Sequence, residues 1–182
     1  MALSLTYTGN PKYTEIAEAT QQANAFLQDG ALFTLISGHE GSFDDSVPNS
    51  LTPAQVAGYF RDENFALTVI DYRDPKRRKS IGGRFQSSMP TVLQINVLAL
   101  PRRRACEFAA VLVHEGTHAL SHRIENSSEH KISFTHVPNA RKGNEDTAPY
   151  WLQSQAQASL CGGASFLTEE PLEVEIEEGG IK

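Results

Sequence analysis

The chain contains a short string whose residue types and spacing favour metal chemistry. His114, Glu115 and His118 form a His-Glu-x-x-His pattern in a chain with only six histidines. In an α-helix, residues four apart differ by about 40° around the axis, so both imidazoles project from one side, one turn apart. Neutral imidazole is a good zinc ligand, and two at this spacing can share an ion. The string therefore predicts Zn²⁺ on His114 and His118.

Glu115 has a different role in this hypothesis. It lies about 100° around the helix from His114, which is too far for it to be the natural third ligand. From there a carboxylate can take a proton from water that the ion polarises, so Glu115 is the candidate general base. The reaction that this combination favours is hydrolysis of a peptide bond. The structural alternative is a pair of buried histidines that are satisfied by hydrogen bonds on an ordinary helix.

The residues around the string have the pattern of one long helix. From Pro101 to about Ile124 there is no internal proline, and Gly116 is the only glycine. A proline at the first position suits the start of a helix. An apolar face recurs at helical spacing and consists of Ala105, Phe108, Leu112, Ala119 and Leu120. This helix must hold both imidazoles and the carboxylate.

Shorter patterns predict further helices. Residues 11–29 have apolar residues at helical spacing, and residues 50–60 begin with Thr52 before Pro53, an N-cap followed by proline at the first helical position. Residues 31–37 fit either a helix or a short strand.

Three β-rich runs predict a small sheet. They cover residues 65–73, 80–86 and 91–100, and turn-like links separate them. In the last run, three aliphatic residues alternate with two amides, so we expect one buried and one solvated face. The expected fold class is α+β, with a small antiparallel or mixed sheet packed on the long helix.

The sheet and helix together resemble a known superfamily. The run TVLQINVLAL, followed by AAVLVHEGTHALSH, resembles the edge strand and active-site helix of zincin metallopeptidases, and the likeness covers residues 65–124. It implies a zincin-like fold, zinc on the two motif histidines and Glu115 as general base. It also implies an edge strand near 91–97, along which an extended substrate lies by β-addition. The small size is similar to that of metallopeptidases that bacterial secretion systems deliver as effectors.

The third ligand is less clearly marked. In the gluzincin branch it is a glutamate in an Asn-Glu-x-x-Ser/Ala pattern, which resembles GNEDTAPYW at 143–151 and implies Glu145. Pro149 departs from that pattern, because it must lie in the first turn of the following helix. Glu145 also fits an acidic residue placed at a helix start without any metal. The other candidates are His122, Asp146, His130 and His136.

Tyr150 follows the candidate third ligand. In similar enzymes a tyrosine or histidine donates a hydrogen bond to the oxyanion of the tetrahedral intermediate, and the resemblance implies that role for Tyr150. The competing interpretation is a core tyrosine beside Trp151.

Composition limits the class of protein. The chain of 182 residues, 40% hydrophobic and 21% charged, predicts a single domain over 1–182, with residues 168–182 as an acidic tail or final strand. A net charge of −6 argues against a nucleic-acid partner. No apolar run approaches the roughly 20 residues that cross a bilayer, so we expect no membrane partner. We expect Cys106 and Cys161 to be buried thiols, with one disulfide as the alternative.

Two functions remain open. The first is a zinc peptidase with a protein or peptide substrate, in the cytoplasm or exported without a classical signal peptide; its oligomeric state is not predicted. The alternative is a catalytically silent zincin-like module that binds a protein in its cleft. The presence of Glu115 favours the enzyme, because a purely structural metal site needs no general base.

Overall fold

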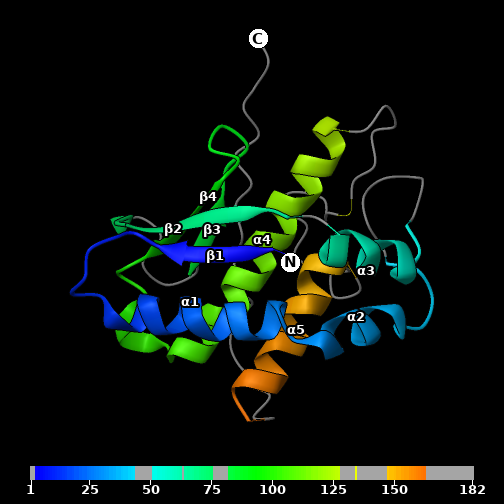
Figure 1. The fold of residues 1–182 in the computed structure, drawn as a ribbon. Helices are drawn as coiled ribbons and strands as arrows, with labels where there is room; N and C mark the ends of the chain where they lie inside the picture. Colours follow the sequence, from blue (N-terminus) through cyan, green and yellow to red (C-terminus); the bar gives the residue numbers. More distant parts are fainter. Residues whose placement is uncertain are drawn as a thin grey trace.

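The computed structural model describes residues 3–43, 51–62, 64–75, 82–127, 134 and 147–162. This part of the chain forms an α+β fold (Figure 1), which confirms the expected class. The predicted tail at 168–182 lies outside it. The strands are β1 (Ser4–Tyr7), β2 (Ala66–Tyr72), β3 (Gly83–Phe85) and β4 (Val92–Asn96). The helices are α1 (Thr14–Leu27), α2 (Gly30–Ser37), α3 (Pro53–Asp62), α4 (Ala105–Ser127) and α5 (Ala148–Leu160), with a short 3₁₀ turn, η2 (Leu100–Arg102).

The sheet is mixed, in the order β1-β2-β4-β3. The first three strands in this order are parallel to one another, and β3 runs antiparallel to β4. A purely antiparallel sheet is therefore wrong and a mixed one is right. The expectation of an edge strand at 91–97 is also wrong, because β4 pairs with β2 on one side and β3 on the other. Within the described strands, β1 and β3 form the edges.

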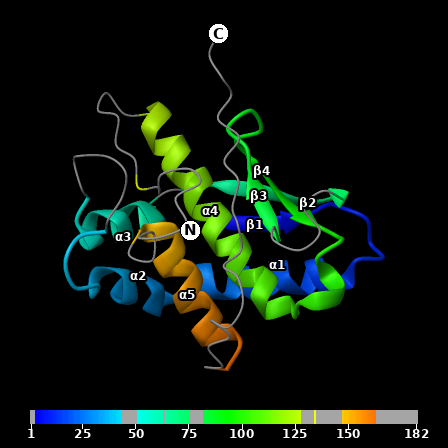
Figure 2. The same cartoon turned by 180° about the vertical axis from the view of Figure 1, so that it is seen from behind.

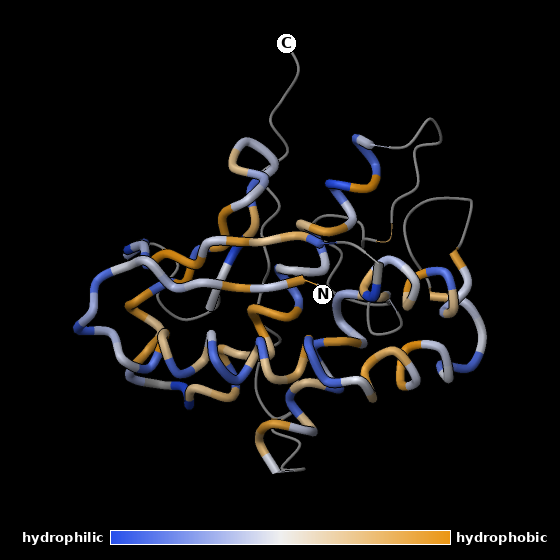
Figure 3. Tube along the Cα trace, in the orientation of Figure 1, coloured by the Kyte–Doolittle hydropathy of each residue, from blue (hydrophilic) through white to orange (hydrophobic). Residues whose placement is uncertain are grey.

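Helices α1 and α4 cover one face of this sheet. Figure 1 shows α1 lying under β1 and β2, with α4 crossing obliquely. Polar and apolar residues alternate along α1 with the helical turn (Figure 3), and its apolar side faces the core. The sheet contributes Leu67, Val69, Leu93 and Ile95 to the same core. Burial of these apolar faces is the main force that holds the layers together.

The other face of β4 is buried as well, which corrects the expectation that Gln94 and Asn96 face water. Gln94 is 7% exposed and Asn96 is fully buried. Each amide is satisfied locally: Arg84 Nε donates to Gln94 Oε1, and the Leu98 backbone N–H donates to Asn96 Oδ1. Alternation of apolar and amide residues therefore marks a central strand here, because hydrogen bonds offset the cost of burying the amides.

Local capping explains where the helices begin. Thr52 and Gln55 form a reciprocal capping box at the start of α3, as the Thr-Pro pair predicted. Residues 31–37, whose sequence fits either a helix or a strand, belong to helix α2. The Asp29 carboxylate caps this helix by accepting a hydrogen bond from the Ala31 backbone N–H. Helix α4 begins at Ala105 and not at Pro101, which belongs to the preceding 3₁₀ turn. In the described ranges no helix is both long and apolar enough to span a bilayer.

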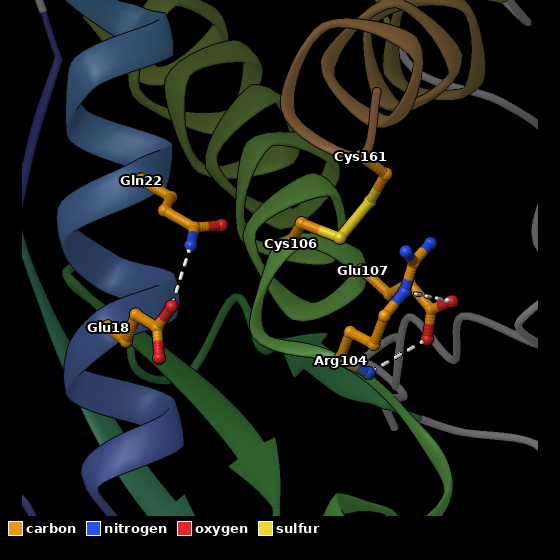
Figure 4. The surroundings of a disulfide bond; sticks show 6 residues. All are labelled: Glu18, Gln22, Arg104, Cys106, Glu107 and Cys161. Carbon is orange, nitrogen blue, oxygen red and sulfur yellow. Dashed lines mark hydrogen bonds and ion pairs between the residues drawn. A yellow bond between two sulfur atoms is a disulfide. The ribbon is translucent and has the colours of Figure 1, made fainter. Parts of the chain in front are cut away.

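The two cysteines form a disulfide, which corrects the expectation of buried thiols. Cys106 lies in the first turn of α4 and Cys161 at the C-terminal end of α5 (Figure 4). Their Cα atoms are 5.5 Å apart, and 55 residues separate them in the chain. Spacing alone cannot reveal such a pairing, since it depends on how α4 and α5 pack against each other.

Candidate metal centre

The two motif histidines lie side by side inside the protein. His114 is fully buried and His118 is 3% exposed, both in the middle of α4. Their Nε2 atoms are 3.1 Å apart and their ring centroids 4.8 Å. The side-by-side placement is what the spacing of four residues in a helix dictates.

The separation of these nitrogen atoms fits two ligands of one zinc ion. In a tetrahedral site with Zn–N bonds of 2.0–2.1 Å, two ligand nitrogens are about 3.3 Å apart. The observed 3.1 Å is close to this value. It also fits an N–H···N hydrogen bond between two neutral imidazoles. Within the described ranges, no group of three or more His, Cys, Asp or Glu side chains is arranged to hold a metal.

Glu115 is the most unusual polar group of the centre. Its side chain is fully buried, and neither carboxylate oxygen has a hydrogen-bond partner of ordinary geometry among the described residues. Burial raises the pKa of Glu115 to about 8, and the nearby backbone of Phe85 offsets only a small part of this shift. In the metal-free protein the carboxyl group is therefore mainly protonated at neutral pH and loses its proton near pH 8.

Two glycines allow the sheet to approach the motif closely. A Cβ on Gly83 would lie 2.7 Å from Val111 Cγ1, so only glycine lets β3 approach α4 this closely. That approach brings the backbone of Phe85 next to Glu115. On the motif itself, a Cβ on Gly116 would lie 3.0 Å from Leu3 Cδ2. A larger residue at position 116 would therefore require the Leu3 side chain to move slightly.

Helix α5 brings Tyr150 to the same place. The Tyr150 ring meets the His114 ring edge to face, with centroids 4.6 Å apart at 82°. Seen from behind, α5 lies alongside α4 (Figure 2). Tyr150 is half-buried in the first turn of α5, directly after the buried Pro149. The structure therefore unites Tyr150 with the motif, although 36 positions separate it from His114 in the chain.

The remaining candidates divide into two groups. His122, one turn beyond His118, is half-buried and contacts the Phe85 ring and the Asn126 side chain. Glu145, Asp146, His130 and His136 lie outside the described residues.

Sequence reasoning did not identify two features near the motif. The first is Phe85, whose backbone approaches Glu115 and whose ring contacts His122. The second is Phe134, a fully buried residue whose backbone N–H donates to Ser121 Oγ at 2.9 Å. Its ring stacks on Tyr59 of α3. Neither carries a local signal, because both contacts join elements that are distant in the chain.

No protein-family model, curated protein or solved structure matches this chain. The interpretation of the centre therefore rests on its own residues.

Proposed function

We propose that the protein is a zinc-dependent peptidase. The observation that carries this proposal is the group of three buried polar side chains on α4. Two imidazole nitrogens lie 3.1 Å apart, beside a carboxylate that has no hydrogen-bond partner of ordinary geometry among the described residues. A buried carboxylate that lacks partners destabilises the fold by several kcal/mol or takes up a proton. Such groups are concentrated at functional sites, where their shifted pKa values are used.

The chain's own residues have distinct roles in this mechanism. His114 and His118 would hold the ion. A bound ion would polarise the water and the scissile carbonyl. Glu115 takes the proton of the attacking water on a carboxylate oxygen and then delivers it to the nitrogen of the leaving amine. Burial raises the pKa of Glu115 to about 8 in the metal-free protein, and a bound cation would lower it, which favours the charged form that accepts a proton.

Glu145 is our candidate for the third ligand. It lies outside the described residues, two positions before Thr147, which is the buried N-cap of α5. The assignment rests on the resemblance of residues 143–151 to the Asn-Glu-x-x-Ser/Ala pattern. The element that follows, α5, contacts His114 through Tyr150 in its first turn.

Tyr150 and β3 are candidates for substrate contacts. The Tyr150 hydroxyl is our candidate donor to the oxyanion that forms as water attacks. β3 lies at the edge of the described sheet and next to Glu115, so an extended peptide can pair with it by β-addition. The substrate class that this favours is an unfolded or extended segment of a protein.

The test combines zinc content with peptide hydrolysis. Native protein is expected to hold about one zinc per chain, and His118→Ala to lose it. Glu115→Gln should retain zinc and fold but lose hydrolysis of an unstructured protein such as casein, because only the proton acceptor is removed. Glu125→Gln, which removes a half-exposed carboxylate from the same helix, is the matched control and should retain both zinc and activity.

Two results would count against the proposal. Undiminished hydrolysis by Glu115→Gln would refute the mechanism. Absence of zinc from native protein, even after incubation with the metal, would favour the binding module, in which the 3.1 Å contact is a hydrogen bond between imidazoles.

A further inference from the structure

The orientation of the His114 ring decides which of its atoms faces His118. In the structure, Nε2 of His114 lies 3.1 Å from Nε2 of His118, the separation that fits two ligands of one zinc ion. The torsion that turns an imidazole ring about its bond to Cβ is broad and roughly two-fold, so the side chain alone does not fix this orientation. Neighbouring groups must therefore hold the plane of the His114 ring.

Two aromatic rings among the described residues contact the His114 ring. The His118 ring meets it at 65°, with centroids 4.8 Å apart, and the Tyr150 ring meets it at 82°, with centroids 4.6 Å apart. Rings that meet edge to face at such distances attract each other beyond the burial of their area. The contact with His118 lies within α4, whereas Tyr150 approaches from a second helix. Rotation of the His114 ring would therefore have to displace the Tyr150 ring.

Tyr150 is itself held in place, because α5 packs closely on α4. These two helices make the most extensive contact between any two described elements, and Figure 2 shows them side by side. Thr147, Ala148 and Pro149, which precede Tyr150, are buried, and the proline ring fixes one backbone dihedral angle at the start of the helix. The Trp151 backbone N–H donates to the Thr147 carbonyl at 2.9 Å. The Tyr150 ring is thus mounted on a well-supported turn.

The side chain of Trp151 attaches the same turn to a third part of the fold. Its ring contacts the rings of His39 and Phe43, with centroids 4.9 and 5.6 Å away. Those two rings stack on each other at 4.4 Å, and Phe43 is only 1% exposed. The first turn of α5 therefore contacts both the segment that follows α2 and the candidate metal centre.

We propose that Tyr150 is a positioning residue for the metal ligand His114, an inference that rests on the proposed zinc site. Its ring holds the plane of the His114 imidazole, so that Nε2 faces Nε2 of His118. This role belongs to the ring, whereas the oxyanion contact proposed above belongs to the hydroxyl. The two roles are separable, because Tyr150→Phe removes only the hydroxyl and Tyr150→Leu removes the hydroxyl and the ring.

The size of the effect follows from two general ranges. An edge-to-face ring pair contributes a factor of about 2 to 10 to an equilibrium constant. Groups that orient a metal ligand contribute about 10- to 100-fold in affinity. The two ranges meet at about tenfold, which is the loss of zinc affinity expected for Tyr150→Leu. Tyr150→Phe should bind zinc within about twofold of native protein, because the ring contact remains, but should have a lower kcat.

The experiment measures zinc affinity of the full chain by competition with a chromophoric chelator. It compares native protein, Tyr150→Phe, Tyr150→Leu and the control Tyr13→Leu. Tyr13 is also a half-buried tyrosine that packs against the core, but it is the N-cap residue of α1. Tyr13→Leu should bind zinc like native protein. Urea unfolding of each variant shows that the samples compared are folded.

A second measurement reads the ring contact without metal. In the metal-free protein the Tyr150 ring shifts the NMR signals of the His114 ring protons, which the spectrum of a His114→Gln variant identifies among the six histidines. These signals should stay near their native positions in Tyr150→Phe and move in Tyr150→Leu.

The outcomes separate this role from the peptidase proposal. Equal zinc affinity of native protein and Tyr150→Leu would overturn the positioning role. An equal loss in Tyr150→Phe and Tyr150→Leu would also overturn it, because the hydroxyl would then be the group that matters, and so would an equal loss in Tyr13→Leu. If native protein binds zinc but hydrolyses no peptide, only the peptidase proposal fails. If native protein binds no zinc, both fail.

Discussion

The buried carboxylate of Glu115 should make the metal-free protein less stable as the pH rises, and Glu115→Gln should remove this loss. The folded protein holds the proton up to a pKa of about 8, against 4.5 for an ordinary glutamate. Between these values the folded state binds more protons than the unfolded state, so the free energy of unfolding falls as pH increases. Below about pH 4.5 both states are protonated and the loss disappears.

The size of the effect follows from the shift. At about 1.4 kcal/mol per pKa unit, the difference between 8 and 4.5 corresponds to an upper limit of about 5 kcal/mol. Relaxation of the surroundings and entry of water reduce this, so we expect about 2 to 5 kcal/mol above pH 8. With a denaturant dependence of roughly 1–3 kcal/mol per molar urea, the midpoints of the two proteins should differ by about 1 M or more.

The assay is urea unfolding with a chelator present, at about pH 5 and about pH 9. Glu115→Gln should be clearly more stable than native protein at the higher pH, with a much smaller difference at the lower one. Glu125→Gln, which removes a half-exposed carboxylate from the same helix, controls for loss of a carboxylate as such. A difference between native protein and Glu115→Gln that is the same at both pH values would refute the reasoning. Zinc should shrink the gap at high pH, because a nearby cation favours the charged carboxylate.

Three further predictions concern packing around the centre. Gly83→Ala should lower the free energy of unfolding by about 1–3 kcal/mol, because the new Cβ overlaps Val111. Gly30→Ala, which has open space around it, is the matched control, and an equal drop in melting temperature for both variants would contradict the explanation. Phe134→Ala should lower the free energy of unfolding by about 3–5 kcal/mol, because the ring is fully buried. A loss below about 0.5 kcal/mol in urea unfolding, as for a surface residue, would contradict the burial of this ring. Removing the disulfide should lower the free energy of unfolding by about 4 kcal/mol, the entropy of opening a loop of this length, and no change in unfolding midpoint would contradict that.

Local rules predicted the helices and three of the four described strands, but not strand β1. The position of α3 follows from Thr52 and Pro53, and α4 from a long periodic segment without internal proline, because both signals act within a few residues. Strand β1 has only four residues and forms by pairing with β2, more than fifty residues later in the chain. The sequence also left an antiparallel and a mixed sheet open, since parallel or antiparallel pairing depends on how the connections cross the sheet.

The same division applies to the metal centre. The sequence alone determined that His114 and His118 share one side of a helix with Glu115 beside them, because helical geometry relates residues four apart whatever surrounds them. Only the tertiary structure decided that Glu115 is fully buried, that Tyr150 faces His114, and that Cys106 bonds to Cys161. These three facts depend on the packing of α4 against β3 and α5. Such packing results from many weak apolar contacts between distant segments, and no short stretch of sequence records it.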